Sequence, residues 1–336
     1  MTILVTGGAG FIGSNFVLDW LRACDEPVIN LDKLTYAGNL QNLASLDGDA
    51  RHVFVHGDFG DAALVAQLLT QHQPRAVVNF AAESHVDRSI IDSSDFIRTN
   101  VEGTRVLLDA AKNNGKIRFH HVSTDEVFGS LGLNDKAFSE ITAYDPRSPY
   151  SASKAASDHL ARAYYHTHKL PITISNCSNN YGPFQFPEKV IPLFITNLLE
   201  NKKVPVYGEG KNIRDWIYVD DHNAGVDAII KKGKIGGTYC LGGNSELTNL
   251  ELTKKILKLM NQSDDMIEYI TDRAGHDLRY AMDFSKAKNE LGWEPVVSFD
   301  QGLKKTIDWY KNNQAWWQNI KSGDYLEYYK KNYLER

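Results

Sequence analysis

The strongest constraint on the fold is a regular alternation, through about residue 176, of short β-branched runs with longer amphipathic segments. This alternation is typical of βαβ units, whose strands lie parallel in one sheet. The strand runs are almost continuously apolar, as expected of strands buried on both faces. The expected strands are 3–5, 28–31, 53–55, 76–80, 117–122 and 172–174, and the expected helices are about 11–23, 61–72, 94–114 and 149–168. We therefore predict an α/β fold with a doubly wound parallel sheet, which binds its ligand beyond the carboxyl ends of the strands.

Composition argues against several classes of function. The 336 residues carry a formal net charge of −5, which gives no basic surface for a nucleic acid. Cys24, Cys177 and Cys240 are widely spaced and lack metal-ligand spacing, so we expect packing roles in a reducing compartment and no metal. The first expected strand begins almost at Met1, and no apolar run approaches the roughly 18 residues of a membrane span. We expect a cytoplasmic protein whose partners are neither nucleic acids nor membranes.

Gly7, Gly10 and Gly13 lie between the first expected strand and the first expected helix. In that context they predict a dinucleotide site, because glycine permits the tight turn, the close approach of the pyrophosphate and the packing of helix on strand. The helix N-terminus then stabilises the phosphate charge. Asp32 ends the second strand, where a carboxylate accepts hydrogen bonds from the adenosine ribose and repels a 2′-phosphate. NAD is therefore favoured over NADP, although Lys33 would offset part of that repulsion.

Two further strand ends carry candidate cofactor residues. Asp58 follows the third strand, where its carboxylate either meets the adenine amino group or belongs to an ordinary turn. Ala81 and Ala82 follow the fourth strand and are small enough for a cofactor to lie against the backbone, or for a helix to pack closely. The residues alone leave these alternatives open.

Tyr150 and Lys154 predict hydride chemistry on the helix expected at about 149–168. Their spacing places both on one helix face, where the ammonium lowers the pKa of the phenol and reaches the nicotinamide ribose. A tyrosinate held in this way removes a proton from a sugar hydroxyl as hydride leaves for NAD. The same helix has a small-residue face suited to close packing, as against a second subunit. That face consists of Ala152, Ala155, Ala156, Leu160 and Ala163.

Thr124, Asp125 and Glu126 come just after the fifth expected strand. In a regular strand, neighbouring carboxyl groups point to opposite faces, and in a loop they are often only solvated. If the strand has ended and both face the pocket, their surroundings push their pKa values apart and supply one acid and one base. Such a pair predicts an elimination in addition to an oxidation.

Several motifs together resemble those of the dTDP-glucose 4,6-dehydratases, a family of extended short-chain dehydrogenase/reductases. The similarity runs from residue 2 to about 312. The motifs occupy residues 6–13, 81–87, 123–129, 150–154, 178–183, 214–216 and 275–277. The resemblance implies a Rossmann-type sheet with a smaller C-terminal substrate-binding lobe.

The resemblance also implies a closed redox cycle on a nucleotide sugar, dTDP-glucose. Tyr150, helped by Thr124 and Lys154, would deprotonate the hydroxyl at carbon 4 while its hydride passes to NAD. Glu126 would then remove the proton on carbon 5 as Asp125 protonates the departing hydroxyl of carbon 6. Return of the hydride to carbon 6 gives dTDP-4-keto-6-deoxyglucose and water, and requires a tightly held, recycled NAD.

Matching the motifs implies two sets of binding residues. The cofactor set is Gly7, Gly10, Phe11, Ile12, Gly13, Asp32, Lys33, Leu34, Thr35, Asp58, Phe59, Ala81, Ala82, Ser84, Thr99, Tyr150, Lys154 and Asn180. The substrate set is Ser84, Thr124, Asn179, Lys189, Val190, Pro205, Tyr207, Arg214, Asn249, Asp272, Arg273 and His276. A guanidinium fork suits a diphosphate, so Arg214 and Arg273 also have a physical reason to bind it, with surface ion pairing as the alternative. Tyr207 either stacks on the base or fills a core.

The alternating pattern becomes irregular after Asn176, where Pro- and Gly-rich segments begin. We expect residues 1–176 to form a Rossmann-type NAD-binding domain with the catalytic residues. We expect residues 177–336 to form mainly the nucleotide-sugar-binding lobe, with some segments returning to the main sheet. Thr248 and Glu251 predict a capping box at a helix start. The Trp- and Tyr-rich stretch 309–333 is expected to pack on the surface, and the chain is expected to form a homodimer, as in the family.

Other functions share part of this pattern. A UDP-glucose 4,6-dehydratase would differ only in the pocket around one methyl group of the base. A nucleotide-sugar 4-epimerase or a decarboxylase of the same fold would share the glycines, Tyr150 and Lys154, but an epimerase has no need of Asp125 and Glu126. An NAD-sensing regulator would need none of these four side chains. Asn176 stands where the family usually has Arg, which bears on nucleotide affinity rather than on reaction type.

Overall fold

The computed structural model describes residues 1–272 and 275–321. Its centre is a seven-stranded parallel sheet in the order β10-β6-β5-β4-β1-β2-β3. The strands are β1 (Ile3–Thr6), β2 (Val28–Asp32), β3 (His52–His56), β4 (Ala76–Asn79), β5 (Arg118–Thr124), β6 (Ile172–Cys177) and β10 (Thr238–Leu241). The strand order reverses between β1 and β4, and ligands of such sheets bind in the crevice at this point. The predicted doubly wound α/β fold is confirmed.

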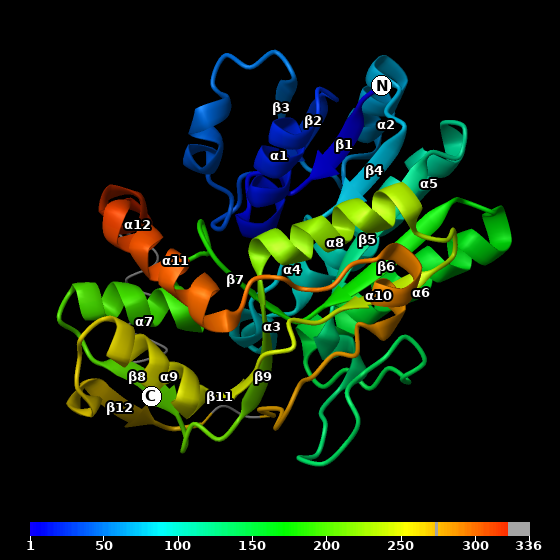
Figure 1. Cartoon of the computed structure of the whole chain (residues 1–336). Helices are drawn as coiled ribbons and strands as arrows, with labels where there is room; N and C mark the ends of the chain where they lie inside the picture. Colours follow the sequence, from blue (N-terminus) through cyan, green and yellow to red (C-terminus); the bar gives the residue numbers. More distant parts are fainter. Residues whose placement is uncertain (273–274, 322–336) are drawn as a thin grey trace.

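Helices cover both faces of the sheet (Figure 1). One face packs against α1 (Phe11–Ala23), α8 (Val219–Lys232) and α10 (Ser285–Leu291). The other packs against α2 (Ala62–His72), α5 (Thr104–Asn113) and α6 (Pro149–His168). The bounds of α1 and α6 agree with the prediction. Within the two described ranges, no helix combines the length and apolar character needed to cross a bilayer.

The helix expected over 94–114 is confirmed in place but is not a uniform α-helix. It consists of α4 (Ser94–Phe96), a π-helical stretch η2 (Ile97–Gly103) and α5. The sequence pattern does not predict the π-helical stretch. Short helices elsewhere are α3 (Val86–Ile91) and the 3₁₀ helices η1 (Leu40–Leu46), η3 (Asp125–Phe128) and η4 (Asp264–Met266).

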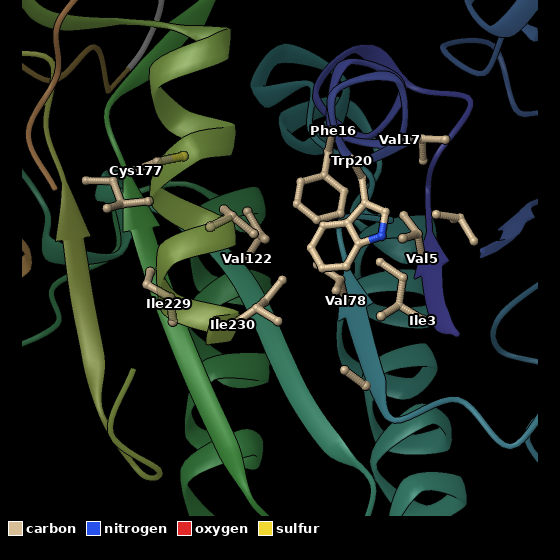
Figure 2. Close-up of a cluster of buried hydrophobic side chains, with 14 of the residues drawn as sticks. Ile3, Val5, Phe16, Val17, Trp20, Val78, Val122, Cys177, Ile229 and Ile230 are labelled. Atoms are coloured by element: carbon tan, nitrogen blue, oxygen red, sulfur yellow. The ribbon is translucent and has the colours of Figure 1, made fainter. Parts of the chain in front are cut away.

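The core on the α1 side shows how the sheet is buried (Figure 2). Phe16 and Trp20 of α1 pack with Ile3 and Val5 of β1, whereas Leu4 belongs to the cluster on the opposite face. This alternation is the two-residue period of a strand with both faces covered. Each fully buried side chain of this kind contributes roughly 1.5–3 kcal/mol. The sheet therefore provides a rigid base for the residues at its carboxyl edge.

A smaller lobe, at the lower left of Figure 1, has its own apolar core. Its short sheets have the orders β11-β9-β7 and β12-β8. Its elements are β7 (Asn179–Tyr181), β8 (Val204–Tyr207), β9 (Ile213–Tyr218), β11 (Glu246–Thr248), β12 (Ile267–Ile270), α7 (Val190–Leu199), α9 (Asn249–Leu259), α11 (Phe299–Asn312) and α12 (Gln314–Ile320). Thr248 caps α9 in a capping box with Glu251, as predicted. β10, from the same half of the chain, pairs with β6 in the main sheet.

Candidate active site

A single cleft runs along the carboxyl ends of the strands and collects most of the predicted site residues. It is lined by the loops after β1, β2, β3, β4 and β5, by residues of α6 and by residues within 177–189. The predicted residues that line it are Gly7, Gly10, Phe11, Ile12, Gly13, Asp32, Lys33, Thr35, Asp58, Phe59, Ala81, Ala82, Ser84, Thr99, Thr124, Asp125, Glu126, Tyr150, Lys154, Asn179, Asn180 and Lys189. The cofactor and catalytic predictions therefore meet in one place.

The glycine loop has the geometry of a phosphate cradle. Gly7 has a φ of +73°, and a Cβ on Gly7 would lie 2.7 Å from the backbone of Ala81. A Cβ on Gly13 would lie 2.1 Å from the carbonyl oxygen of Gly7. Gly10 begins α1 without a side-chain cap from the described residues, so the first amides of this helix are available to an anion in the cleft. These observations fit a bound pyrophosphate.

Asp32 is fixed at the end of β2 by the backbone. Its Oδ2 accepts a hydrogen bond from the amide of Ala9 at 2.9 Å, and its Oδ1 accepts one from the amide of Leu34 at 2.8 Å. Burial raises the pKa of Asp32, and the two amides act in the opposite direction. Leu34 has a φ of +54° and is not among the residues that line the cleft. Its backbone, rather than its side chain, therefore shapes the site.

Lys33 and Asp58 form an ion pair of 2.7 Å at the cleft edge. Burial acts to raise the pKa of Asp58, but Lys33 and the amide of Gly60 outweigh it, and the net shift is downward. Both side chains are substantially exposed, so the pair contributes little stability. Lys33 is thus engaged by Asp58, which limits its ability to offset the repulsion of a 2′-phosphate by Asp32.

Asp125 and Glu126 do not belong to a strand. β5 ends at Thr124, and η3 begins at Asp125, with the Thr124 hydroxyl accepting a hydrogen bond from the amide of Glu126 at 3.3 Å. The prediction required that the strand end before the two carboxyl groups, and the structure meets this condition. Both line the same cleft.

Asp125 has the environment of a neutral acid. It is 1% exposed, and its Oδ1 accepts a hydrogen bond from the Thr124 hydroxyl at 3.2 Å. Burial raises its pKa well above the usual range, the charge of Glu126 raises the pKa further, and Arg214 partly offsets the rise. These surroundings favour the neutral, protonated form of the carboxyl group relative to a solvated carboxyl group.

Tyr150 and Lys154 lie one turn apart on α6, and both are buried. Lys154 Nζ donates to the carbonyl oxygen of Val122 at 2.8 Å. Burial and the charge of Glu126 raise the pKa of Tyr150 well above its usual value, and a side-chain hydrogen bond with Thr124 acts in the opposite direction. The net shift of the phenol pKa is therefore upward in the protein alone, because the phenol is desolvated, which the sequence does not report. The lowering of this pKa by Lys154 stays a prediction.

Asp158 lies one further turn along the same helix, behind Lys154. Its Oδ2 accepts hydrogen bonds from Tyr144 Oη at 2.7 Å and Ser123 Oγ at 2.9 Å. Burial lowers the pKa of Lys154, and the carboxylate of Asp158 offsets part of that effect. Asn176 Nδ2 donates to the carbonyl oxygen of Thr124 at 3.1 Å. Asn176 therefore supports the end of β5 directly, next to the predicted catalytic residues.

The other predicted substrate residues do not line this cleft. They are Val190, Pro205, Tyr207, Arg214, Asn249, Asp272 and His276, and Arg273 lies outside the described residues. Tyr207 and His276 have ring centroids 6.0 Å apart, and His276 Nδ1 lies 2.7 Å from Asp272 Oδ1. Arg214 is buried, and its Nη2 donates to the carbonyl oxygen of Asp277 at 3.0 Å. These residues thus lie outside the lining of the cleft, but the charge of Arg214 still acts on the pKa of Asp125.

Sequence reasoning missed a second polar group in the cleft wall. Tyr36 lies under the guanidinium of Arg88, 4.0 Å from the ring centre, and edge-on to Phe186 at 5.4 Å. Glu188 Oε2 lies 3.4 Å from Arg88 and 3.6 Å from His85. Burial raises the pKa of Glu188, and neighbouring cations act in the opposite direction. Tyr36 and Phe186 lie in loops and Arg88 lies in α3, and these segments are distant in sequence, so no local pattern predicts their contact.

Comparison with known proteins agrees with this geometry. The family described as GDP-mannose 4,6 dehydratase matches residues 4–306. A dTDP-glucose 4,6-dehydratase of Xanthomonas campestris is 55% identical, over 96% of this chain and 97% of the relative. The chain belongs to the family of dTDP-glucose 4,6-dehydratases. The resemblance drawn from the motifs is confirmed.

Solved structures extend the comparison to three dimensions. A dTDP-glucose 4,6-dehydratase of Streptomyces venezuelae with NAD and TYD bound is 49% identical, with a TM-score of 0.93, over 95% of this chain and 100% of that one. A UDP-glucose 4-epimerase of Thermotoga maritima is 29% identical, with a TM-score of 0.87, over 94% and 100% of the two chains. The dehydratase family thus shares its fold with epimerases, so the site must carry the distinction between the two reactions.

Proposed function

We propose that this protein converts dTDP-glucose to dTDP-4-keto-6-deoxyglucose and water, with one NAD held and recycled. The observation that carries the proposal is the buried, high-pKa carboxyl of Asp125 next to Glu126, beside Tyr150 in a dinucleotide-type cleft. Relatives named for this reaction support it. We further propose that residues 1–176 are the NAD-binding and catalytic part and residues 177–336 mainly the substrate-binding part.

The residues present fit NAD. Amides at the start of α1 would meet the pyrophosphate, and the fixed carboxylate of Asp32 would accept the ribose hydroxyls. Lys154 would donate a hydrogen bond to the ribose of the nicotinamide half of the cofactor. When bound, NAD would supply the hydride acceptor for carbon 4 and, once reduced, the hydride donor for carbon 6. Because Asp32 carries a charge that opposes a 2′-phosphate, NAD is preferred over NADP.

Tyr150 acts as the base for the hydroxyl at carbon 4. Burial keeps the phenol protonated in the protein alone, so proton removal needs additional positive charge in the closed site. The Lys154 ammonium is already present on the same helix, so the cationic nicotinamide ring of bound NAD would have to supply the added charge, and the Thr124 side chain is hydrogen-bonded to the phenol. The ketone formed at carbon 4 acidifies the proton on carbon 5.

Glu126 and Asp125 divide the elimination between them. Glu126, at the cleft surface, takes the proton from carbon 5, and neutral Asp125 gives its proton to the hydroxyl leaving carbon 6. Water then departs, and the proton is returned to carbon 5 as carbon 6 is reduced. An epimerase needs neither transfer, which is why this pair favours the dehydratase.

The substrate spans both groups of predicted residues. Ser84 and Lys189 would contact the sugar within the cleft, where Lys189 Nζ already donates to the carbonyl oxygen of Ser84 at 3.0 Å. The set on the small lobe, from Val190 to His276, would hold the nucleotide. We also propose that the protein works as a cytoplasmic homodimer.

The test is to incubate purified protein with dTDP-glucose, without added NAD, and to weigh the sugar nucleotide. A loss of about 18 Da, the mass of the water eliminated by acid and base, supports the dehydratase and a retained cofactor together. UDP-glucose serves as the comparison substrate, and its preferential use would change the base assigned to the substrate. An unchanged mass together with inversion at carbon 4 would replace the dehydratase by an epimerase.

A further inference from the structure

The C-terminal helix α12 carries two buried tryptophans with different partners. Trp317 Nε1 donates to the carbonyl oxygen of Tyr310 at 2.9 Å, within the helical pair α11–α12 of the small lobe. Trp316 Nε1 donates at 2.9 Å to Asn42 Oδ1, which lies in η1 on the cofactor side of the molecule. α12, red in Figure 1, and the blue segment between β2 and β3 lie on the same side of the protein. Trp316 therefore bridges the two parts of the chain.

Asn42 also forms a hydrogen bond with the glycine loop. Its Nδ2 donates at 3.0 Å to the carbonyl oxygen of Ala9, between Gly7 and Gly10. The amide of Ala9 in turn donates at 2.9 Å to Asp32 Oδ2. Trp316, Asn42, Ala9 and Asp32 are each no more than 9% exposed. An uninterrupted series of buried hydrogen bonds thus runs from the C-terminal helix to the carboxylate that faces the adenosine ribose.

The direction of each bond makes the series dependent on the indole. Because Trp316 offers only a donor, it holds the oxygen of the Asn42 amide toward itself and the NH₂ group toward Ala9. Without that donor, the Asn42 oxygen would be buried with no indole partner, and rotation of the amide would turn it against the carbonyl of Ala9. Either outcome loosens the segment that precedes α1.

We propose that Trp316 is a positioning residue for the dinucleotide. Through Asn42 it holds Ala9 in place, and with it the carboxylate of Asp32 and the start of α1. The proposal rests on the NAD-dependent function proposed above, and adds that retention of the cofactor depends on the C-terminal helix. Trp316 touches neither the sugar nor the reacting groups, so its effect is on holding the cofactor rather than on chemistry.

The matched pair W316F and W317F tests this in the full-length protein. Each variant loses one buried indole N–H bond from the same helix, but only Trp316 contacts the cofactor side. Protein loaded with isotopically labelled NAD is diluted into excess unlabelled NAD, and release of the label is followed by filtration. Thermal midpoints of both variants report the common cost to stability.

We expect W316F to release label at least about tenfold faster than the parent protein, because Asn42 loses its buried hydrogen-bond partner. W317F should stay within about threefold of the parent release rate. For W316F the KM for added NAD should rise while kcat at saturating NAD stays within about twofold. N42D keeps the acceptor for Trp316 but removes the donor to Ala9, so it should also release label faster and decides the matter if W316F does not fold.

Equal release rates for W316F and W317F would overturn the proposal, as would N42D releasing label at the parental rate. The parent protein is measured first. If the parent binds no labelled NAD, the proposed function fails together with this inference. If the parent protein holds NAD but W316F and W317F release the label at equal rates, the inference fails and the proposed function stands.

Discussion

Replacing Asp125 by Asn tests the acid assigned to the elimination. The substitution keeps the size of the side chain and its acceptor oxygen, which bonds to the Thr124 hydroxyl. It removes the proton that the hydroxyl on carbon 6 needs in order to leave as water. Oxidation at carbon 4 does not use this proton and should continue.

The magnitude follows from the environment of Asp125. With the ordinary pKa of 3.8, only about one carboxyl in 1,600 would hold its proton at pH 7. Burial and the charge of Glu126 raise the pKa of Asp125 well above that value, so a larger share of the molecules carries the acid at pH 7. Loss of a positioned acid costs about 10²- to 10⁴-fold, or roughly 3–5 kcal/mol in the barrier to elimination.

The assay separates the steps of the reaction. Asp125→Asn protein is mixed with dTDP-glucose in D₂O, reduced nicotinamide is followed by its absorbance, and the sugar is analysed for deuterium at carbon 5. We expect reduction of the cofactor, exchange of the carbon 5 proton and very slow loss of water. Glu126→Gln is the matched control, because it should also block dehydration but without exchange at carbon 5.

Two results would refute the reasoning. Dehydration by Asp125→Asn within about tenfold of the parent rate would exclude Asp125 as the acid, because a positioned acid contributes more than that. Exchange at carbon 5 that is lost in Asp125→Asn and kept in Glu126→Gln would reverse the two roles.

Gly13→Ala should abolish NAD retention, because the new Cβ would lie 2.1 Å from the Gly7 carbonyl oxygen; a variant purified with the parental NAD content would contradict this. Burial lowers the pKa of His222 to about 4, so the unfolded chain binds a proton between about pH 6.5 and 4 that the folded protein does not. Stability should fall over this window as pH drops, by roughly 3 kcal/mol for this group. Urea unfolding at pH 7 and pH 4.5 measures the fall, and His222→Phe should reduce it. Glu188→Gln should lower the free energy of unfolding by about 1–3 kcal/mol, because it removes a buried anion that faces Arg88 and His85. Asp95→Asn, in an exposed ion pair, is its control and should change stability by no more than about 1 kcal/mol.

The part of the fold that the sequence predicts well is the part with strong local signals. α1 starts at the glycine loop, and α6 starts at a capping box of Ser148 and Ser151 followed by a regular apolar face, so both helices lie where expected. The short strands β7, β9 and β11 are different. They are only three to six residues long and pair across long sequence separations, so their contacts are not encoded in any local period.

The site divides in the same way. Asp125 and Glu126 were predictable, because a buried strand followed by two carboxyl groups places them at the ligand edge of the sheet. The pKa of Tyr150 was not, since desolvation depends on everything that surrounds the phenol. The contact of Tyr36 with Arg88 and Phe186 was missed for a related reason: two loops and helix α3, which are distant in sequence, must first be brought together by the fold.

The central claim is that one protein-bound cofactor takes hydride from carbon 4 and returns it to carbon 6. The most direct measurement uses dTDP-glucose with deuterium on carbon 4, incubated with purified protein and no added NAD. We expect a 4-keto-6-deoxy product with the deuterium in its carbon 6 methyl group. Deuterium lost to solvent, or a sugar that keeps all its oxygen and its label on carbon 4, would contradict it.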